Sequence, residues 1–474
     1  MTRRPDVVVA GGGVAGVMAA ITARRHGLAV TLVDDNATPG GQVFREPSAF
    51  ARTVTPPDHE RREGDRLREL LRRSGVRVLS GWGIWSVQPG YRLDLSNDFA
   101  VQVLEAGSLV AATGAVERFF PFAGWTDPAV MGLAGASLLL RAGGVLPGRR
   151  TLVAGAGPLL FSVAHQVLDA GGEVVAIVDT ATRTQWAARA ATLALDPARL
   201  KTGVAWMARL ARAGIPVLGG AVIRQARRGE DDLDVTIGSV RGGAPVRSVR
   251  CDAIACGYGL KPSLGLTRML KARHVFDEAA GYWHPHADPF GRTDVAGLYV
   301  TGDGAGVRGA QMARLRGILT GHGLAFDHGR IDAATLAHLA RPLLRAMRRL
   351  EVVSRAMTSL MNPRPAIMKE AEMHAPDTLM CRCERVSIAA GRQAIRDGAG
   401  DMNQFKAWTR CGMGPCQGRM CEDSARQLLA RHTARAPAEV GAFTQRLPLR
   451  PVPVRALSGN FAYADIVLPQ AAPP

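Results

Sequence analysis

The sequence predicts an α/β protein built from two Rossmann-like dinucleotide-binding domains and a small, helical, cysteine-rich domain near its C-terminal end. Residues 6–34 have the pattern of a strand, a glycine-rich turn, a helix and a second strand, and the same order recurs over residues 150–179. Five of the seven cysteines lie between residues 381 and 421. With 474 residues the chain can form more than one core, since single cores stop growing near about 250 residues.

Composition and charge indicate the broad class of protein. Hydrophobic residues make up 47% of the chain and charged residues 21%, which is typical of globular proteins. The net charge of +18 would suit an anionic cofactor, an acidic partner or a nucleic acid. Because no basic run is interleaved with aromatic residues, we favour solvated arginine-rich helices and expect no nucleic-acid partner. No apolar stretch is long enough to span a membrane. We expect a cytoplasmic protein whose clustered cysteines are metal ligands or redox groups rather than disulfides.

The first glycine-rich turn has the context of a dinucleotide site. Gly11, Gly13 and Gly16 fit the pattern G-x-G-x-x-G between a strand and a helix. In this pattern the first glycine allows the tight turn, the second lets a pyrophosphate approach, and the third allows the helix to pack closely on the strand. The N–H groups at the start of the helix then face the phosphates. The residues expected to bind the dinucleotide here are Gly11, Gly13, Val14, Ala15, Gly16 and, at the end of the next strand, Asp34 and Asp35.

Three later segments favour FAD over NAD as the ligand of this first domain. They are PGGQVFR at 39–45, AATGA at 111–115 and TDVAGLYVTGDGAG at 293–306. The residues that they add to the expected site are Gly41, Gln42, Thr113, Gly114, Gly302 and Asp303. From about residue 5 to about residue 325 the chain resembles the two-dinucleotide-domain flavoprotein disulfide reductase superfamily. The resemblance implies that Asp303 contacts the ribityl and phosphate portion of FAD, and that the second nucleotide domain is inserted into the first.

The second glycine-rich turn, AGAGPLL, departs from the pattern. It keeps Gly155 and Gly157 but has Leu160 where a third small residue is expected. Asp179, at the end of the following strand, would suit an unphosphorylated ribose. The superfamily resemblance implies NAD(P)H at this fold, and NAD(H), an adenine nucleotide and an empty structural fold all remain open. The domain lacks the redox C-x-x-C of thioredoxin-reductase-type enzymes.

The C-terminal cysteines are candidates for a metal centre. A diiron cluster needs four thiolates, which are soft anionic ligands. Cys381 and Cys383 form C-x-C, and either Cys411 with Cys416 or Cys416 with Cys421 would complete the set, since both pairs are spaced C-x4-C. The spacing alone leaves this choice open. A closed zinc site is the main alternative, because four cysteines also suit tetrahedral zinc.

The cysteine-rich module resembles the [2Fe-2S] domain of bacterioferritin-associated ferredoxin. In flavoprotein relatives that also carry GMGPCQGR, the position of Cys411 is frequently not cysteine. The resemblance therefore implies that Cys411 is a spare thiol and that the cluster ligands are Cys381, Cys383, Cys416 and Cys421. The basic residues that would offset the negative charge of such a cluster are Arg382, Lys406, Arg410 and Arg419.

The order of the parts resembles the α subunit of bacterial amino-acid and opine dehydrogenases. This group includes one of the hydrogen cyanide synthase subunits and the octopine oxidase, nopaline oxidase and D-hydroxyproline dehydrogenase α subunits. CRCE, GMGPCQGRMC, PFAGWTDPAVMGLAGAS and GYGLKPS carry this resemblance. It implies an electron-transferring subunit with FAD and a [2Fe-2S] cluster, and a partner β subunit whose own flavin oxidises a C–N bond. Further implications are a small ferredoxin-like γ subunit, and peripheral attachment of the complex to the inner face of the membrane.

Two other functions remain open. An NAD(P)H-dependent reductase that feeds a ferredoxin or a nitrite-reductase-type acceptor would need a pyridine nucleotide at the second fold. A zinc-stabilised nucleotide-binding regulator would be a non-enzymatic alternative. No pair of residues indicates substrate chemistry, so no catalytic residue is assigned.

The expected domains are an FAD-binding domain (1–118 and 290–329), a second nucleotide-binding domain (119–289), a helical connector (330–375), a [2Fe-2S]-binding domain (376–432) and an extended tail (433–474).

Overall fold

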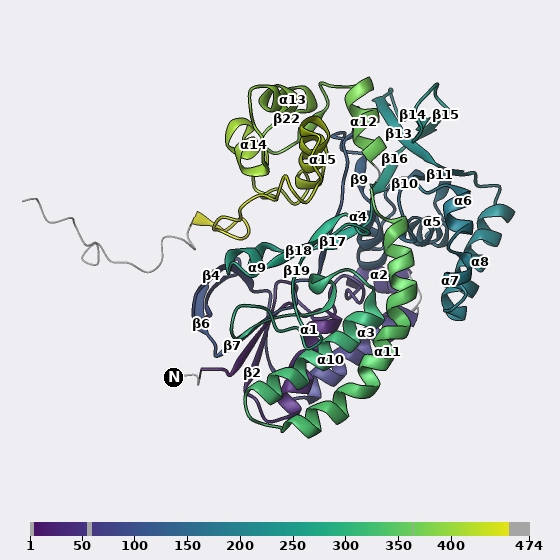
Figure 1. The fold of residues 1–474 in the computed structure, drawn as a ribbon. Helices are drawn as coiled ribbons and strands as arrows, with labels where there is room; N and C mark the ends of the chain where they lie inside the picture. Colours follow the sequence, from purple (N-terminus) through teal and green to yellow (C-terminus); the bar gives the residue numbers. More distant parts are fainter. Residues whose placement is uncertain (1–3, 55–58, 364, 455–474) are drawn as a thin grey trace, which may run out of the picture.

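The computed structural model describes residues 4–54, 59–363 and 365–454. Two parallel sheets form the body of the protein (Figure 1). The first sheet has the strand order β20-β7-β1-β2-β3, and neighbouring strands are parallel throughout. Its strands are β1 (Val7–Ala10), β2 (Val30–Asp34), β3 (Arg77–Ser80), β7 (Ser108–Ala111) and β20 (Leu298–Val300).

Both faces of the first sheet are covered, which explains why its central strands are continuously apolar. On one face pack α1 (Val14–Arg25), α3 (His59–Arg73) and α10 (Ala310–Asp327). Helices α1 and α10 lie so close together that a side chain at Gly317 would overlap the backbone of Ala15. The other face carries the antiparallel strands β4 (Gly83–Gln88), β5 (Arg92–Ser96) and β6 (Val101–Glu105).

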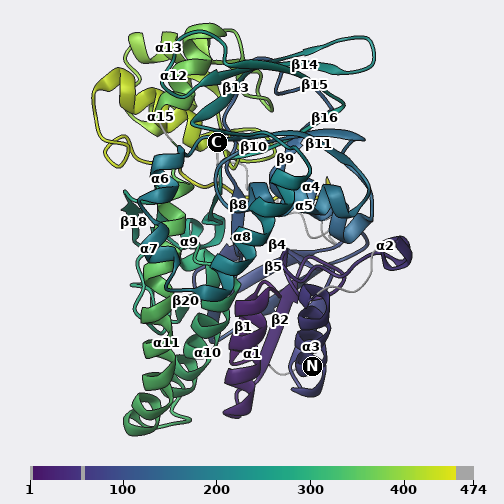
Figure 2. The ribbon, with the colours of Figure 1, turned by 90° about the vertical axis from the view of Figure 1, so that its right-hand side faces the viewer.

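The second sheet has the order β12-β11-β10-β16-β9 and is also parallel. Its strands are β9 (Val130–Gly132), β10 (Arg150–Gly155), β11 (Glu173–Asp179), β12 (Val217–Gly219) and β16 (Ala253–Gly257). One face carries α4 (Leu133–Leu138), α5 (Leu159–Asp169) and α8 (Pro197–Arg212). The other carries the antiparallel strands β13 (Ala221–Arg228), β14 (Leu233–Ser239) and β15 (Arg247–Cys251), seen at the top of Figure 2. The predicted α/β fold with two Rossmann-like sheets is confirmed.

A short antiparallel pair connects the two folds. It consists of β8 (Ala115–Glu117) and β17 (Leu260–Pro262), and it is followed by α9 (Gly265–Met269) and the hairpin of β18 (His274–Asp277) and β19 (Tyr282–Pro285). Leu266 and Ala272 are buried in the core of the first fold, whereas the sequence predicts all of residues 119–289 in the second domain. The difference arises because β17 pairs with β8 and so returns the chain to the first fold before α9 begins.

Residues expected to form a helical connector make up α11 (Ala333–Leu360) and α12 (Pro365–His374). Helix α11 extends from the first fold to the second (Figures 1 and 2). Ser354 of α11 donates a hydrogen bond to the Arg308 carbonyl of the first fold, and Ser359 accepts one from Arg189 of the second.

The remaining short elements are α2 (Ala49–Val54), a π-helical turn (Leu139–Gly143), α6 (Arg183–Ala187), α7 (Ala190–Leu193) and a 3-10 turn (Gly302–Ala305).

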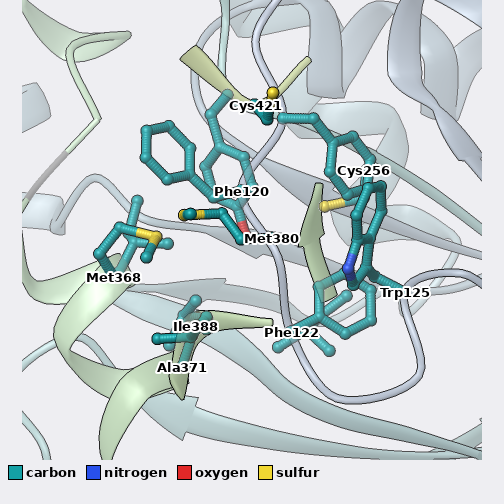
Figure 3. Packing of buried hydrophobic residues seen from close by; sticks show 14 of the residues in the cluster. Phe120, Phe122, Trp125, Cys256, Met368, Ala371, Met380, Ile388 and Cys421 are labelled. Atoms are coloured by element: carbon teal, nitrogen blue, oxygen red, sulfur yellow. The ribbon is translucent and has the colours of Figure 1, made fainter. Parts of the chain in front are cut away.

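The cysteine-rich module is small and helical. It consists of the hairpin of β21 (Leu379–Cys381) and β22 (Val386–Ser387) and the helices α13 (Ile388–Arg396), α14 (Met402–Thr409) and α15 (Glu422–Thr433). Its core continues into that of the second fold, since Phe120, Trp125, Met380 and Cys421 belong to one buried cluster (Figure 3). The Trp125 indole also donates a hydrogen bond to the Leu379 carbonyl at 2.6 Å. The module is therefore packed on the body of the protein.

After α15 the chain runs without regular structure from the module to the first fold. Phe443 packs against Gly412 and Gly418 of the module. Leu449 is buried in the core of the first fold, and its N–H donates to the Trp85 carbonyl at 2.7 Å. Of the extended tail expected over 433–474, residues 455–474 lie outside the described part.

Among the described helices none combines the length and the apolar character that crossing a membrane requires.

Candidate functional site

The residues expected to bind FAD converge at one edge of the first sheet. Gly11 follows β1, Asp34 ends β2, Thr113 comes shortly after β7 and Gly302 comes shortly after β20. These four strands are parallel neighbours, so their carboxyl ends meet at the same edge. Open α/β sheets bind their ligands at this edge. The structure therefore brings together segments that are far apart in the chain.

The glycine turn after β1 has the geometry of a phosphate site. Gly11 has a φ of +112°, and a side chain there would lie 2.3 Å from the Ala112 carbonyl oxygen. A side chain at Gly16 would lie 2.0 Å from the Gly11 carbonyl oxygen, so α1 can approach β1 only with glycine at this position. At Gly13 the nearest atom would be the Gly41 Cα, 3.8 Å away. The backbone at Gly13 is thus open to a phosphate, beside the N–H groups that start α1.

Asp34 lies against the glycine turn. Its side chain accepts hydrogen bonds from the N–H groups of Gly12 at 2.5 Å and Asn36 at 2.7 Å. Burial raises the pKa of Asp34. A carboxylate oxygen can accept more than one hydrogen bond, so ribose hydroxyls can still be bound there. Asp35, in contrast, is exposed, and its carboxylate pairs with Arg450 of the tail at 3.2 Å.

Asp303 faces the same edge from the other side. It accepts hydrogen bonds from the N–H groups of Arg308 at 3.1 Å and Gly309 at 3.4 Å, and burial raises its pKa. Gly302, with a φ of +66°, packs against Ala15 in the first turn of α1. The other expected residues at this edge are Val14, Gly41, Gln42, Thr113 and Gly114. An open phosphate cradle between the buried Asp34 and the half-buried Asp303 fits FAD.

The second glycine turn repeats the backbone of the first but offers a poorer site for phosphate. Gly155 and Gly157 have φ values of +132° and +91°. Pro158, which follows directly, has no N–H group, so the start of α5 has one hydrogen-bond donor fewer than the start of α1. Leu160 stands in place of the third glycine and is fully buried.

Side chains from other segments occupy the space around the second glycine turn. A side chain at Gly157 would lie 2.3 Å from the Cγ atom of Met361, which follows α11. Met361 therefore occupies the position from which a pyrophosphate would approach the backbone. The Asp179 carboxylate accepts hydrogen bonds from the Trp186 indole at 2.8 Å and the Ala181 N–H at 2.9 Å. The second turn therefore leaves a pyrophosphate less room and fewer N–H donors than the first turn does.

All five C-terminal cysteines lie in one group. The sulfur atoms of Cys381, Cys411 and Cys421 are buried and within 4.8 Å of one another. The Cys416 thiol interacts with those of Cys421 and Cys383. None of these five cysteines forms a disulfide. The four expected ligands are thus neighbours, but Cys411, expected as a spare thiol, lies in the innermost part of the same group.

Hydrogen bonds around Cys381 favour a thiolate. Thiol donors from Cys411 and Cys421, together with the N–H groups of Gly412 and Glu384, lower the pKa of Cys381 to about 2. Hydrogen bonds to the charged form of a group lower its pKa, and such donors to sulfur are typical of metal-binding thiolates.

The thiols form an inner and an outer set. The inner set is the buried group of Cys381, Cys411 and Cys421. The outer set is Cys383, which is exposed, and Cys416, which is half-buried. The Cys421 thiol, with N–H groups of the loop that precedes it, lowers the pKa of Cys416 to about 5. A diiron cluster takes two thiolates at each iron, and each of the two sets can supply two.

The loop between α14 and α15 encloses the thiols closely. A side chain at Gly414 would lie 2.3 Å from the Cys383 Cβ atom, and Gly412 and Gly418 have φ values of +87° and +81°. The glycines of GMGPCQG are therefore required by the path of the chain. Of the four expected cations, Arg419 donates to the Cys416 carbonyl at 3.4 Å. Among the other three, Lys406 interacts electrostatically with Cys421, Arg410 pairs with Glu384 at 2.8 Å, and Arg382 lies over the Trp125 ring.

Two residues near these sites were not singled out from the sequence, although Lys261 belongs to the GYGLKPS segment. One is Met361, at the end of a long helix. The other is Lys261, 6% exposed, whose Nζ lies 2.7 Å from the Asp423 carboxylate. Burial acts to raise the pKa of Asp423, but the charges of Lys261, Arg426 and Arg118 outweigh it and lower the pKa. In the sequence, the acidic pair Glu422 and Asp423, directly after Cys421, could have indicated that a basic partner such as Lys261 lies nearby.

Comparison with known proteins assigns the family. The family described as "Pyridine nucleotide-disulphide oxidoreductase" matches residues 5–317. The chain belongs to this family. The family described as "Sarcosine oxidase A3 domain" matches residues 378–460, which include the cysteine-rich module. The predicted FAD-dependent oxidoreductase is therefore confirmed at the level of the family.

Similar proteins extend over nearly the whole chain. An opine oxidase subunit of Rhizobium meliloti (strain 1021) is 33% identical over 462 residues, which cover 94% of this chain and 97% of the relative. The hydrogen cyanide synthase subunit HcnB of Pseudomonas aeruginosa is 32% identical, with coverages of 96% and 98%. The solved structure of L-proline dehydrogenase from P. horikoshii has the same fold, with a TM-score of 0.71 at 20% identity over 96% of this chain and 79% of that chain. The predicted resemblance to the α subunits of opine and amino-acid dehydrogenases is confirmed.

Proposed function

We propose that this chain is the electron-transferring subunit of a multi-subunit dehydrogenase that oxidises a C–N bond of an amino acid, imino acid or opine. The observation that carries the proposal is the group of five thiols packed on a fold whose open glycine turn fits FAD. When bound, FAD exchanges electrons in pairs or singly and a [2Fe-2S] cluster accepts them one at a time. The relatives are named as subunits of opine oxidase and hydrogen cyanide synthase, which supports a role within a complex.

The residues of the first sheet edge would hold FAD by backbone N–H groups and by two carboxylates. Gly13 and the start of α1 would bind the pyrophosphate, Asp34 would accept the ribose hydroxyls, and Asp303 would face the ribityl portion. In the module we propose Cys381, Cys383, Cys416 and Cys421 as ligands. Two of them belong to the inner set and two to the outer set, which supplies two thiolates to each iron.

The partner that we propose is a β subunit with its own flavin and the substrate site, together with a small ferredoxin-like γ subunit. In the described part of this chain, the geometry of the two sites serves binding of electron carriers, and we assign no residue to substrate chemistry. Free thiols suit a reducing compartment, so we propose a cytoplasmic location.

The second candidate function, an NAD(P)H-dependent reductase, needs a pyridine nucleotide at the second fold. The contact between Met361 and Gly157 and the missing N–H group of Pro158 speak against it. We therefore favour electrons delivered by a partner protein rather than by NAD(P)H.

The test uses the full chain purified without oxygen. We expect a flavin spectrum, about two iron atoms and two acid-labile sulfides per chain, and no zinc. NADH alone should leave the flavin oxidised, whereas a β subunit, added with its amino-acid or opine substrate, should bleach it. A flavoprotein with stoichiometric zinc and neither iron nor sulfide would contradict the proposal. Rapid bleaching by NADH alone would favour the reductase.

A further inference from the structure

Strand β17 links the edge expected to bind FAD with the cysteine-rich module. Ser263, which follows the strand, donates its N–H to the Gly114 carbonyl at 3.0 Å and accepts a hydrogen bond from the Thr113 hydroxyl at 3.0 Å. Thr113 and Gly114 belong to the proposed FAD site. Within the strand, the Nζ atom of Lys261 lies 2.7 Å from a carboxylate oxygen of Asp423 in the module.

Asp423 lies next to the proposed cluster. Glu422 and Asp423 follow Cys421 directly and form the first turn of α15. One side-chain contact therefore joins the strand beside the FAD site to a residue two positions from an inner-set thiol. The connection from the FAD site to the thiols thus passes through a series of neighbouring residues: Thr113 or Gly114, Ser263, Lys261, Asp423 and Cys421.

Further buried charges surround this contact. Lys261 also lies 3.8 Å from Glu422, and Arg268 of α9 lies 2.8 Å from the other oxygen of Glu422. Arg426 pairs with Asp423 within α15. All five side chains are at most 15% exposed. Three cations and two carboxylates thus meet at the boundary between the flavin-binding fold and the module.

This network of charges orients the module on the flavin-binding fold more than it stabilises the folded chain. Buried ion pairs lose in desolvation much of what they gain in attraction, and apolar replacements are often neutral or stabilising. The apolar cluster around Phe120 and Trp125 already holds the module on the body, but apolar burial is non-directional. Charged groups in direct contact require a defined distance, and the hydrogen bond from Arg268 to Glu422 at 2.8 Å also requires a defined angle. The network therefore determines where the start of α15 lies relative to β17.

We propose that Lys261 is a positioning residue for electron transfer, holding the Cys421 end of the thiol group against the strand that borders the FAD site. This inference rests on the proposed function, because it presumes FAD and a cluster in one chain. Without the Lys261 ammonium group, Asp423 loses its contact across the boundary. The start of α15 then lies farther from β17, and electrons pass more slowly between the two groups.

The experiment follows electron transfer within the full-length chain. Bound FAD is photoreduced anaerobically by a laser flash with EDTA as the electron donor, and cluster reduction is followed by absorbance and by freeze-quench EPR. Lys261→Met should keep the wild-type FAD and iron contents and lower the rate constant of cluster reduction at least tenfold. Lys261→Arg should restore most of the rate. Lys369→Met, which changes an exposed lysine on α12, is the matched control and should behave as wild type.

A second variant guards against failure to fold. Lys261→Met/Asp423→Leu removes both charges of the 2.7 Å contact, while Glu422 keeps its partner Arg268 and Arg426 keeps its hydrogen bond to the Gly281 carbonyl. A slow rate in this folded, iron-containing variant supports the inference, and a wild-type rate in either variant overturns it. If the wild-type chain itself lacks iron and sulfide, the proposed function fails. If it contains both and the rate is indifferent to Lys261, the inference alone fails.

Discussion

Among single residues, the cysteines pose the sharpest question, because a diiron cluster takes four thiolates and the group has five. Cys383 and Cys416 form the outer set, and no other thiol lies there among the described residues. In the inner set, Cys411 and Cys421 both donate to Cys381. In the proposed cluster they would therefore compete for one position at the inner iron, whereas Cys416 would have no substitute.

The first prediction separates these roles. Cys416→Ser should abolish iron binding and keep FAD, because the residues that fit FAD lie on the first sheet and not in the module. Cys411→Ser, the matched variant, should keep both cofactors. Iron and flavin contents of the purified proteins measure the outcome. An iron-free Cys411→Ser protein would show that Cys411, and not Cys421, holds the contested position.

Among the elements, α4 begins beside a half-buried carboxylate, that of Glu117. Glu117, the last residue of β8, accepts a hydrogen bond from the Ala134 N–H at 2.8 Å in the first turn of α4. Burial raises the pKa of Glu117 to about 7. A carboxyl group whose pKa is higher in the folded chain than its ordinary value of 4.5 binds more protons when folded. Its contribution to stability is therefore full at low pH and is lost as pH rises toward about 7.

The second prediction follows from this linkage. Glu117→Gln keeps an acceptor for the same N–H groups but cannot ionise. The unfolding temperature of the variant relative to wild type should rise between pH 4.5 and 7 and stay constant above that range. Thermal unfolding across this pH range measures the difference. A difference that does not change with pH would mean that Glu117 does not titrate in this range.

The end of helix α11 determines how accessible the glycine turn of the second fold is to a nucleotide. Its end places Met361 on Gly157. The third prediction is that the wild-type chain binds NAD weakly and that Met361→Ala increases the affinity at least tenfold, measured by calorimetry. Met347→Ala changes a methionine in the middle of the same helix and should leave the affinity unchanged. Tight binding of NAD by the wild type would mean that Met361 moves aside readily.

Over the whole molecule, the module shares its apolar core with the second fold rather than with the FAD edge. The fourth prediction is that removing iron with a chelator under anaerobic reducing conditions leaves FAD bound. The same treatment should lower the unfolding temperature, since a group bound only by the folded state stabilises it. Flavin absorbance and scanning calorimetry measure the two effects. Release of FAD together with iron would show that the two sites depend on each other.

The sequence by itself determined the two parallel sheets, the glycine turn at Gly11 and the convergence of Asp34, Thr113 and Gly302 at one edge. Strand periodicity and turn glycines are local properties, and parallel neighbouring strands place their carboxyl ends together without further information. The clustering of C-terminal cysteines likewise indicated a metal centre. Family membership followed from the same motifs.

Only the tertiary structure decided four contacts: Cys411 beside Cys381, Met361 on Gly157, Arg450 on Asp35 and Lys261 on Asp423. Each joins residues that are far apart in the chain, and the cysteine spacing had left the choice between Cys411 and Cys421 open. Their positions depend on how the module, α11 and the tail pack on the body as a whole. Because that packing is set by apolar burial summed over many distant residues, no local pattern could reveal which side chains would meet.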